Sequence, residues 1–149
     1  MQPLNLPTYS FKIKSSENKY FIFDIVRKKY MVLTPEEWVR QHFVHYLISA
    51  KKYPISLIAI EKKVTVNKLT KRTDILVFNA KGKPHIIVEC KAPSIKISQD
   101  AFDQIARYNL KLEADYLIVT NGLTHFYAVM DLENECYVFL DSIPNYEKK

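Results

Sequence analysis

Glycine is the residue that this sequence lacks most clearly, with two among 149 residues. The phosphate-binding loop of many nucleotide hydrolases requires a Gly-x-x-x-x-Gly-Lys-Ser/Thr pattern. The one Gly-Lys pair is Gly82-Lys83, but Val77 stands at the position of the first glycine and Pro84 at that of the hydroxyl residue. The chain therefore encodes no nucleotide hydrolase of this kind.

Cysteine is equally scarce, with two residues. Cys90 and Cys136 lack Cys-x-x-Cys spacing and fall in apolar stretches, so we expect reduced thiols in the core rather than a disulfide or a metal ligand. The four histidines lack the partners and spacing of a zinc site: His42, His45, His85 and His125. We expect no zinc centre.

Long apolar runs are also missing. No stretch approaches the roughly 20 residues that a membrane-spanning helix needs. Residues 1–10 lack the basic start and apolar segment of a secretory signal. We therefore expect a cytoplasmic protein without a membrane partner.

Apolar residues make up 48% of the chain, enough for one sizeable core. We expect a single domain with an N-terminal hairpin extension (1–33), a core (34–130) and a C-terminal strand and tail (131–149). A net charge of +6 suits a polyanionic partner, although such a charge also serves solubility. Basic residues gather before and at the strand that is expected to contain Asp74: Lys62, Lys63, Lys68, Lys71 and Arg72.

Two acidic residues and a lysine accompany two neighbouring apolar runs. Asp74 precedes Ile75–Phe78, and Glu89 and Lys91 end the run that starts at Ile86. Residues 79–84 have a turn composition, which predicts a hairpin that brings Asp74 within reach of Glu89. Strand side chains alternate between faces, so Glu89 and Lys91 share one face. Such a charged trio is suited to a divalent cation and a phosphodiester.

The Glu-x-Lys pattern alone carries little weight, because it occurs four times: at Glu17, Glu61, Glu89 and Glu147. Among these matches, only Glu89 has an aspartate one hairpin away. The alternative interpretation is a solvated strand end with a surface ion pair.

The remaining elements follow from periodicity and capping. Thr34 as N-cap and Pro35 at the first helical position predict a helix to about Lys51, with Glu37 completing a capping box. Strands follow at 57–66, 74–78 and 86–91, and Ser98–Glu113 is predicted as an amphipathic helix. Later strands are expected at 116–120, 125–130 and 136–140. This order predicts an α/β fold with a mixed sheet flanked by helices, plus an N-terminal and a C-terminal β-hairpin.

The order Asp74, then Glu89-Cys90-Lys91, then Gln104 and Tyr108 four residues apart resembles the PD-(D/E)XK nuclease superfamily in its Gln-x-x-x-Tyr branch. With Arg72-Thr73 before the aspartate and Thr120-Asn121-Gly122 further on, it looks like the N-terminal nuclease domain of type I restriction enzyme R subunits. The similarity spans about residues 34–130. The name-giving Pro-Asp is Thr73-Asp74 here, which leaves the carboxylate in place.

The resemblance implies a restriction-endonuclease-like αβββαβ core and a Mg²⁺-dependent DNA endonuclease, with Mn²⁺ able to substitute. Asp74, Glu89 and the backbone carbonyl of Cys90 would hold the metal, and Lys91 would complete the catalytic set. A glutamate of the first helix often joins this site: Glu36 fits by helix face and Glu37 by sequence spacing. The remaining implied contacts position DNA or the catalytic lysine: Gln104, Tyr108, Arg72 and Lys71.

Type I R subunits also carry a translocase, so the resemblance implies a separate motor or specificity subunit as partner. We expect sequence-tolerant, salt-dependent DNA binding. Two other classes remain open: a catalytically silent DNA-binding or assembly module with a nuclease fold, and a domain for protein interaction. The sequence leaves a homo-oligomer open.

Overall fold

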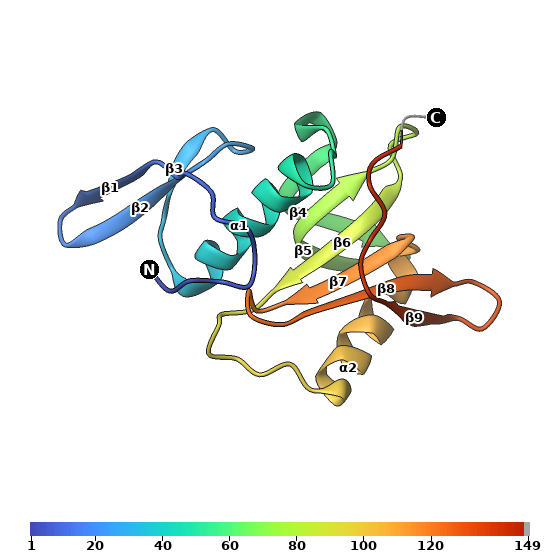
Figure 1. The fold of residues 1–149 in the computed structure, drawn as a ribbon. Helices are drawn as coiled ribbons and strands as arrows, with labels where there is room; N and C mark the ends of the chain where they lie inside the picture. Colours follow the sequence, from blue (N-terminus) through green and yellow to red (C-terminus); the bar gives the residue numbers. More distant parts are fainter. Residues whose placement is uncertain (148–149) are drawn as a thin grey trace.

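A six-stranded mixed sheet forms the centre of the computed structural model, which describes residues 1–147 (Figure 1). The strands lie in the order in which they occur in the sequence: β4 (Ile58–Val66), β5 (Leu69–Phe78), β6 (Pro84–Cys90), β7 (Tyr116–Thr120), β8 (His125–Asp131) and β9 (Cys136–Leu140). The β6–β7 pair is parallel and every other neighbouring pair is antiparallel. The parallel step is possible because a helix-containing crossover separates these two strands.

One helix covers each face of this sheet (Figure 1). Helix α1 (Pro35–Ser49) buries Phe43 and Leu47 in one apolar cluster with Ile75 of β5. Helix α2 (Gln99–Asn109) buries Phe102 in the other cluster, with Leu76 of β5. Two short 3-10 turns, Ile55–Leu57 and Leu110–Leu112, adjoin these elements. The predicted α/β class and the αβββαβ order of the core are confirmed.

The N-terminal extension has one more strand than the predicted hairpin. Its antiparallel sheet consists of β1 (Ile13–Ser16), β2 (Lys19–Asp24) and β3 (Lys29–Val32). Phe11, which lies just before β1, packs against Trp38 and His42 of α1, with ring centroids 5.4 and 4.7 Å apart. The third strand was missed because residues 27–32 are basic and lack alternating polarity.

The C-terminal hairpin agrees with the prediction, but the exposure of one of the two cysteines does not. Cys136, at the start of the edge strand β9, is exposed, whereas Cys90 is buried. Both thiols are free. The expectation of two core cysteines was therefore wrong for Cys136, because only one face of an edge strand meets the core. Among the described residues, no helix has the length and apolar character needed to cross a membrane.

The turn after β7 holds the N-terminal segment against the core. The side chain of Asn121 accepts the N–H groups of Leu123 and Thr124, and the Gly122 carbonyl accepts the N–H of Asn5 at 2.8 Å. Gly122 has a left-handed φ of 86°, and a Cβ there would lie 2.8 Å from a methyl carbon of Leu4. Only glycine tolerates both the conformation and the approach.

We expect Gly122→Ala to lower the free energy of unfolding by about 2–3 kcal/mol, combining left-handed strain with the clash. Gly82→Ala is the matched control, because Gly82 also has a positive φ, 77°, but faces open space. It should cost about 1 kcal/mol. Urea denaturation measures the loss of unfolding free energy in both variants. In a Leu4→Ala background, which removes the clashing methyl carbon, the losses caused by the two glycine substitutions should become more similar. Equal losses in the two variants would contradict this packing.

Candidate active site

The strand pairing around Asp74 is locally interrupted. Ile60 pairs with Ile75 and Lys62 with Thr73, while Glu61, which lies between them, has a left-handed φ of 53°. On the other side of β5, Asp74 Oδ2 accepts the backbone N–H of Cys90 at 2.7 Å. A carboxylate thus caps the β5–β6 pairing. The distortion gathers the Glu61 and Asp74 side chains on the side of α1.

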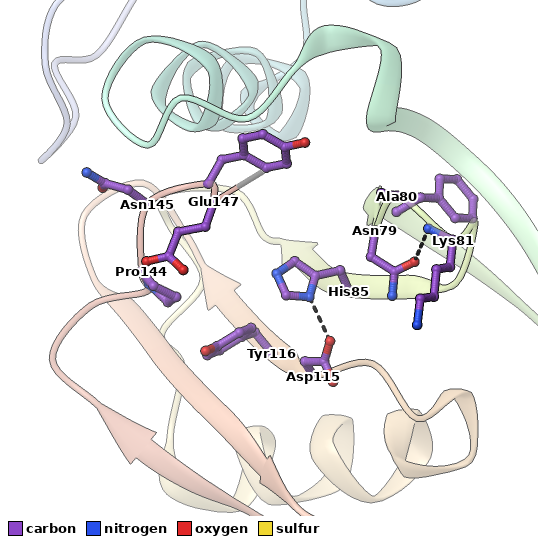
Figure 2. A pocket seen from close by; sticks show the side chains of 11 residues that line it. Asn79, Ala80, Lys81, His85, Asp115, Tyr116, Pro144, Asn145 and Glu147 are labelled. Carbon is purple, nitrogen blue, oxygen red and sulfur yellow. Dashed lines mark hydrogen bonds and ion pairs between the residues drawn. The ribbon is translucent and has the colours of Figure 1, made fainter. Parts of the chain in front are cut away.

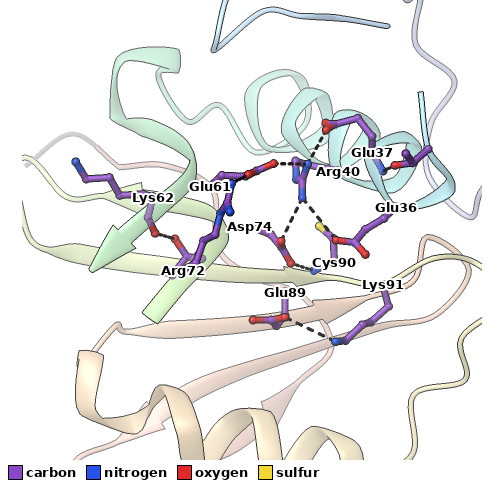
Figure 3. Close-up of polar contacts among 12 residues, drawn as sticks. Glu36, Glu37, Arg40, Glu61, Lys62, Arg72, Asp74, Glu89, Cys90 and Lys91 are labelled. Carbon is purple, nitrogen blue, oxygen red and sulfur yellow. Dashed lines mark hydrogen bonds and ion pairs between the residues drawn. The ribbon is translucent and has the colours of Figure 1, made fainter. Parts of the chain in front are cut away.

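Arg40 of α1 lies at the centre of these carboxylates (Figure 3). Its Nη1 donates to Glu37 at 2.6 Å and to Glu61 at 3.3 Å, and its Nη2 donates to Asp74 at 3.2 Å. Glu36 lies 3.6 Å from Nη2. Burial opposes the charge of Arg40, but Glu37 and Asp74 raise its pKa above the ordinary value. One buried guanidinium therefore faces four acidic groups.

A second guanidinium connects this cluster to the N-terminal sheet. Arg27 follows β2 and donates to Asp24, to both oxygens of Glu37 at 2.9 and 3.0 Å, and to Glu61 at 3.2 Å. Asp24 is fully buried. The geometry corrects one expectation: Thr34 does cap the Glu37 N–H at 3.0 Å, but the Glu37 carboxylate binds arginines instead of completing a capping box.

Glu89 and the lysines form the second half of the site. Lys71 of β5 donates to Glu89 Oε1 at 3.0 Å, and Lys91 lies 3.9 Å from Glu89 Oε2. The Lys71 ammonium also lies 4.4 Å from the centre of the Tyr108 ring on α2. In Figure 3 Glu89 turns towards Lys91, whereas Asp74 turns towards Arg40.

The structure brings several of the predicted residues together. Glu36 is about half exposed, and burial raises the pKa of its carboxyl. The charge of Asp74 raises this pKa further, and so does that of Glu89, against the opposing effect of Arg40 and Lys91. Glu36 therefore shares one electrostatic environment with the predicted trio. Of the two helix glutamates, Glu36 faces this site and Glu37 is enclosed by arginines.

The other predicted contacts are more dispersed. Gln104 is exposed on α2, and Tyr108 meets the site through Lys71. Arg72 is exposed and pairs with Glu61 on the α1 side. Sequence reasoning missed Arg27, Arg40 and Glu61. The signal for Glu61 was its register, since it stands opposite Asp74 on the preceding strand, and for Arg40 its position one turn after Glu36.

The donor chemistry of the site suits a hard divalent cation. Carboxylates and a backbone carbonyl are the ligands that Mg²⁺ favours, and Mg²⁺ often takes only one or two carboxylates together with waters and phosphate oxygens. Within residues 1–147, no group of three or more His, Cys, Asp or Glu side chains is placed so that it could hold a metal ion, so such a site relies on two carboxylates and the carbonyl. Burial and, after it, the Asp74 charge raise the pKa of Glu36, and a bound cation would oppose both effects.

Residues 35–144 match the family model described as the type I restriction enzyme R protein N terminus. The chain belongs to this family. The match extends from α1 to beyond β9 and includes every carboxylate around Arg40. The three strands of the N-terminal sheet lie outside it. The comparison with curated proteins found no match.

This R protein N-terminal domain has a second hollow, far from the carboxylates. A pocket of about 450 Å³ lies beside the β5–β6 turn and the C-terminal segment (Figure 2). His85 Nδ1 and Asp115 Oδ2 are 2.7 Å apart in its wall. His85 is the second residue of β6 and Glu89 lies near its end, so this pocket belongs to the opposite end of the strand.

We expect Glu37→Gln to lower the free energy of unfolding by about 3 kcal/mol, because it removes the charge that two enclosed guanidinium groups face. The adjacent Glu36→Gln is the matched control. Its side chain is 48% exposed, so the change should stay within about 0.5 kcal/mol. Thermal and urea unfolding of both variants measure the difference. Similar stabilities for the two variants would be incompatible with the assigned roles.

Proposed function

We propose that the domain is a Mg²⁺-dependent DNA endonuclease of the type I R-subunit kind, with a PD-(D/E)XK site. The observation that carries the proposal is the pairing of β5 with β6, in which Asp74 Oδ2 accepts the backbone N–H of Cys90, the residue between Glu89 and Lys91, at 2.7 Å. Membership in a restriction-enzyme family supports nuclease chemistry and a DNA substrate. Mn²⁺ substitutes for Mg²⁺ in this proposal.

Asp74, Glu89 and the Cys90 carbonyl are the proposed metal ligands, with Glu36 as an additional carboxylate. The bound cation supplies an activated water and stabilises the leaving oxygen. Arg40 fixes the Asp74 carboxylate through the 3.2 Å contact. Lys91, with its side chain 40% exposed, either orients and deprotonates the water or offsets charge on the phosphorane.

The proposed DNA contacts come from the β4–β5 hairpin and α2. Lys71 and Arg72 point to opposite sides of β5, towards Glu89 and Glu61 respectively, so they flank the cleavage site. Tyr108 holds the Lys71 ammonium, and Gln104 lies one turn earlier on the same helix. Such contacts to phosphates carry no sequence information. Specificity and loading are proposed to come from a separate motor or specificity subunit.

A catalytically silent DNA-binding module is the second candidate. One observation favours it: the carboxylates are already matched by cations, since Asp74 binds Arg40 and Glu89 binds Lys71. A divalent cation has to compete with these ammonium and guanidinium groups. Cleavage and metal-binding measurements separate the two candidates.

We expect Asp74→Asn, Glu89→Gln and Lys91→Met each to reduce Mg²⁺-dependent cleavage of plasmid and linear DNA by about a hundredfold or more. Each removes one charge of the site at nearly constant shape. Asp115→Asn is the control, because this exposed carboxylate lies at the other end of the sheet. Cleavage by the parent but not by the three variants supports the proposal. Full cleavage activity in these three variants would contradict the catalytic assignment.

We expect Mg²⁺ and Mn²⁺ to support cleavage and Ca²⁺ to bind without supporting it. All three prefer oxygen ligands, but Ca²⁺ has a looser, larger coordination shell. Binding is measured as a rise in the thermal midpoint with added Ca²⁺, which Asp74→Asn should abolish. Metal binding without cleavage under any condition favours the silent module. Cleavage that survives chelation contradicts both the metal-dependent mechanism and the silent module.

A further inference from the structure

The N-terminal sheet has two unlike faces. Its register aligns Ile13, Ile22 and Met31 on one face, where Ile22 and the nearby Asp24 are fully buried. The other face, called here the outer face, alternates basic residues with apolar ones. Its members are Lys12, Lys14, Lys19, Phe21, Phe23, Tyr30 and Val32.

Rings and ammonium groups lie in contact on the outer face. The Phe23 and Tyr30 rings meet edge to face with centroids 5.2 Å apart. The Lys14 ammonium lies 4.2 Å from the centre of the Tyr30 ring, and that of Lys12 lies 5.5 Å from that of Phe23. Tyr30 is 37% exposed, so part of its ring faces solvent beside the Lys14 ammonium. Flat rings beside mobile cations form a surface on which bases stack and phosphates bind.

Charge complementarity points to a polyanion. Residues 11–32 contain six basic and two acidic residues, so they carry +4 of the chain's +6 net charge. One of the two acidic residues, Asp24, is buried and paired with Arg27. Glu17, in the β1–β2 turn, is the other. The cations of the outer face therefore have little acidic compensation nearby.

A groove leads from this sheet to the carboxylate site. It has a volume of about 570 Å³, begins at Met31 and Val32 of β3, and continues to Glu36, Arg40 and Glu61. The contacts of Arg27 with Asp24, Glu37 and Glu61 fix the sheet relative to the site. The groove therefore reaches Arg40, whose guanidinium binds Asp74 at 3.2 Å.

We propose that the outer face binds single-stranded DNA, with unpaired bases stacked on Phe21, Phe23 and Tyr30 and phosphates held by the lysines. Duplex DNA is disfavoured because paired bases do not present their faces to a sheet. The binding itself is independent of the proposed nuclease function. The further step, that the groove delivers the strand to Asp74, rests on that function.

The test is fluorescence anisotropy of the whole chain with a labelled oligothymidylate and, separately, a duplex, both in EDTA so that no cleavage occurs. Tyr30→Ala should weaken single-strand binding about tenfold, because one stacked base is lost. Lys12→Gln with Lys14→Gln should weaken it and reduce the salt slope by about 0.7 per lost phosphate contact. Tyr20→Ala is the matched control. Tyr20 lies on β2, is 63% exposed and points to the opposite face, so binding should be unchanged.

Thermal unfolding confirms that each variant is folded. No binding of the oligonucleotide, a preference for the duplex, or equal losses in Tyr30→Ala and Tyr20→Ala would overturn the proposal. Asp74→Asn separates the two claims, since it should abolish cleavage but keep single-strand binding. Binding without cleavage in the parent leaves this inference standing and removes the nuclease proposal. Cleavage by the parent together with unchanged single-strand binding by Tyr30→Ala keeps the nuclease proposal and removes this inference.

Discussion

The Arg40 guanidinium, surrounded by carboxylates from α1, β4 and β5, is the interaction on which the rest of the site depends. Burying a charge is costly unless partners surround it, and here Glu37, at 2.6 Å, is the closest. Glu37 fixes the Arg40 guanidinium through Nη1, and Nη2 is thereby positioned to donate to Asp74 at 3.2 Å. The position of the Asp74 carboxylate therefore depends on α1 as well as on β5.

The two adjacent glutamates of α1 have different roles in this arrangement. Glu37 is enclosed by Arg27, Arg40 and Gln41, so its role is to join the helix to the N-terminal sheet. Glu36 is half exposed, and burial together with the Asp74 charge raises the pKa of its carboxyl. The same helical turn thus contributes one residue to stability and one to the proposed chemistry.

Much of the fold was accessible from the sequence, because its signals are local. The Thr34 cap, the turn before Pro84 and the alternation around Asp74 and Glu89 each depend on neighbouring residues. What was missed depends on tertiary contacts. The third strand of the N-terminal sheet has no alternating pattern, and Arg40 lies in a helix interior where a charge is normally solvated. Glu61 looked like one Glu-x-Lys match among four until its register opposite Asp74 was visible.

The central claim is that Asp74, within β5, and Glu89, near the end of β6, form a divalent-cation site despite the nearby arginine and lysines. The most direct test is an anomalous difference map from crystals grown with Mn²⁺. The account predicts one strong peak within coordination distance of Asp74, Glu89 and the Cys90 carbonyl, with no peak in crystals of Asp74→Asn. A map without a peak at these atoms, while Asp74 stays bound to Arg40, would contradict it.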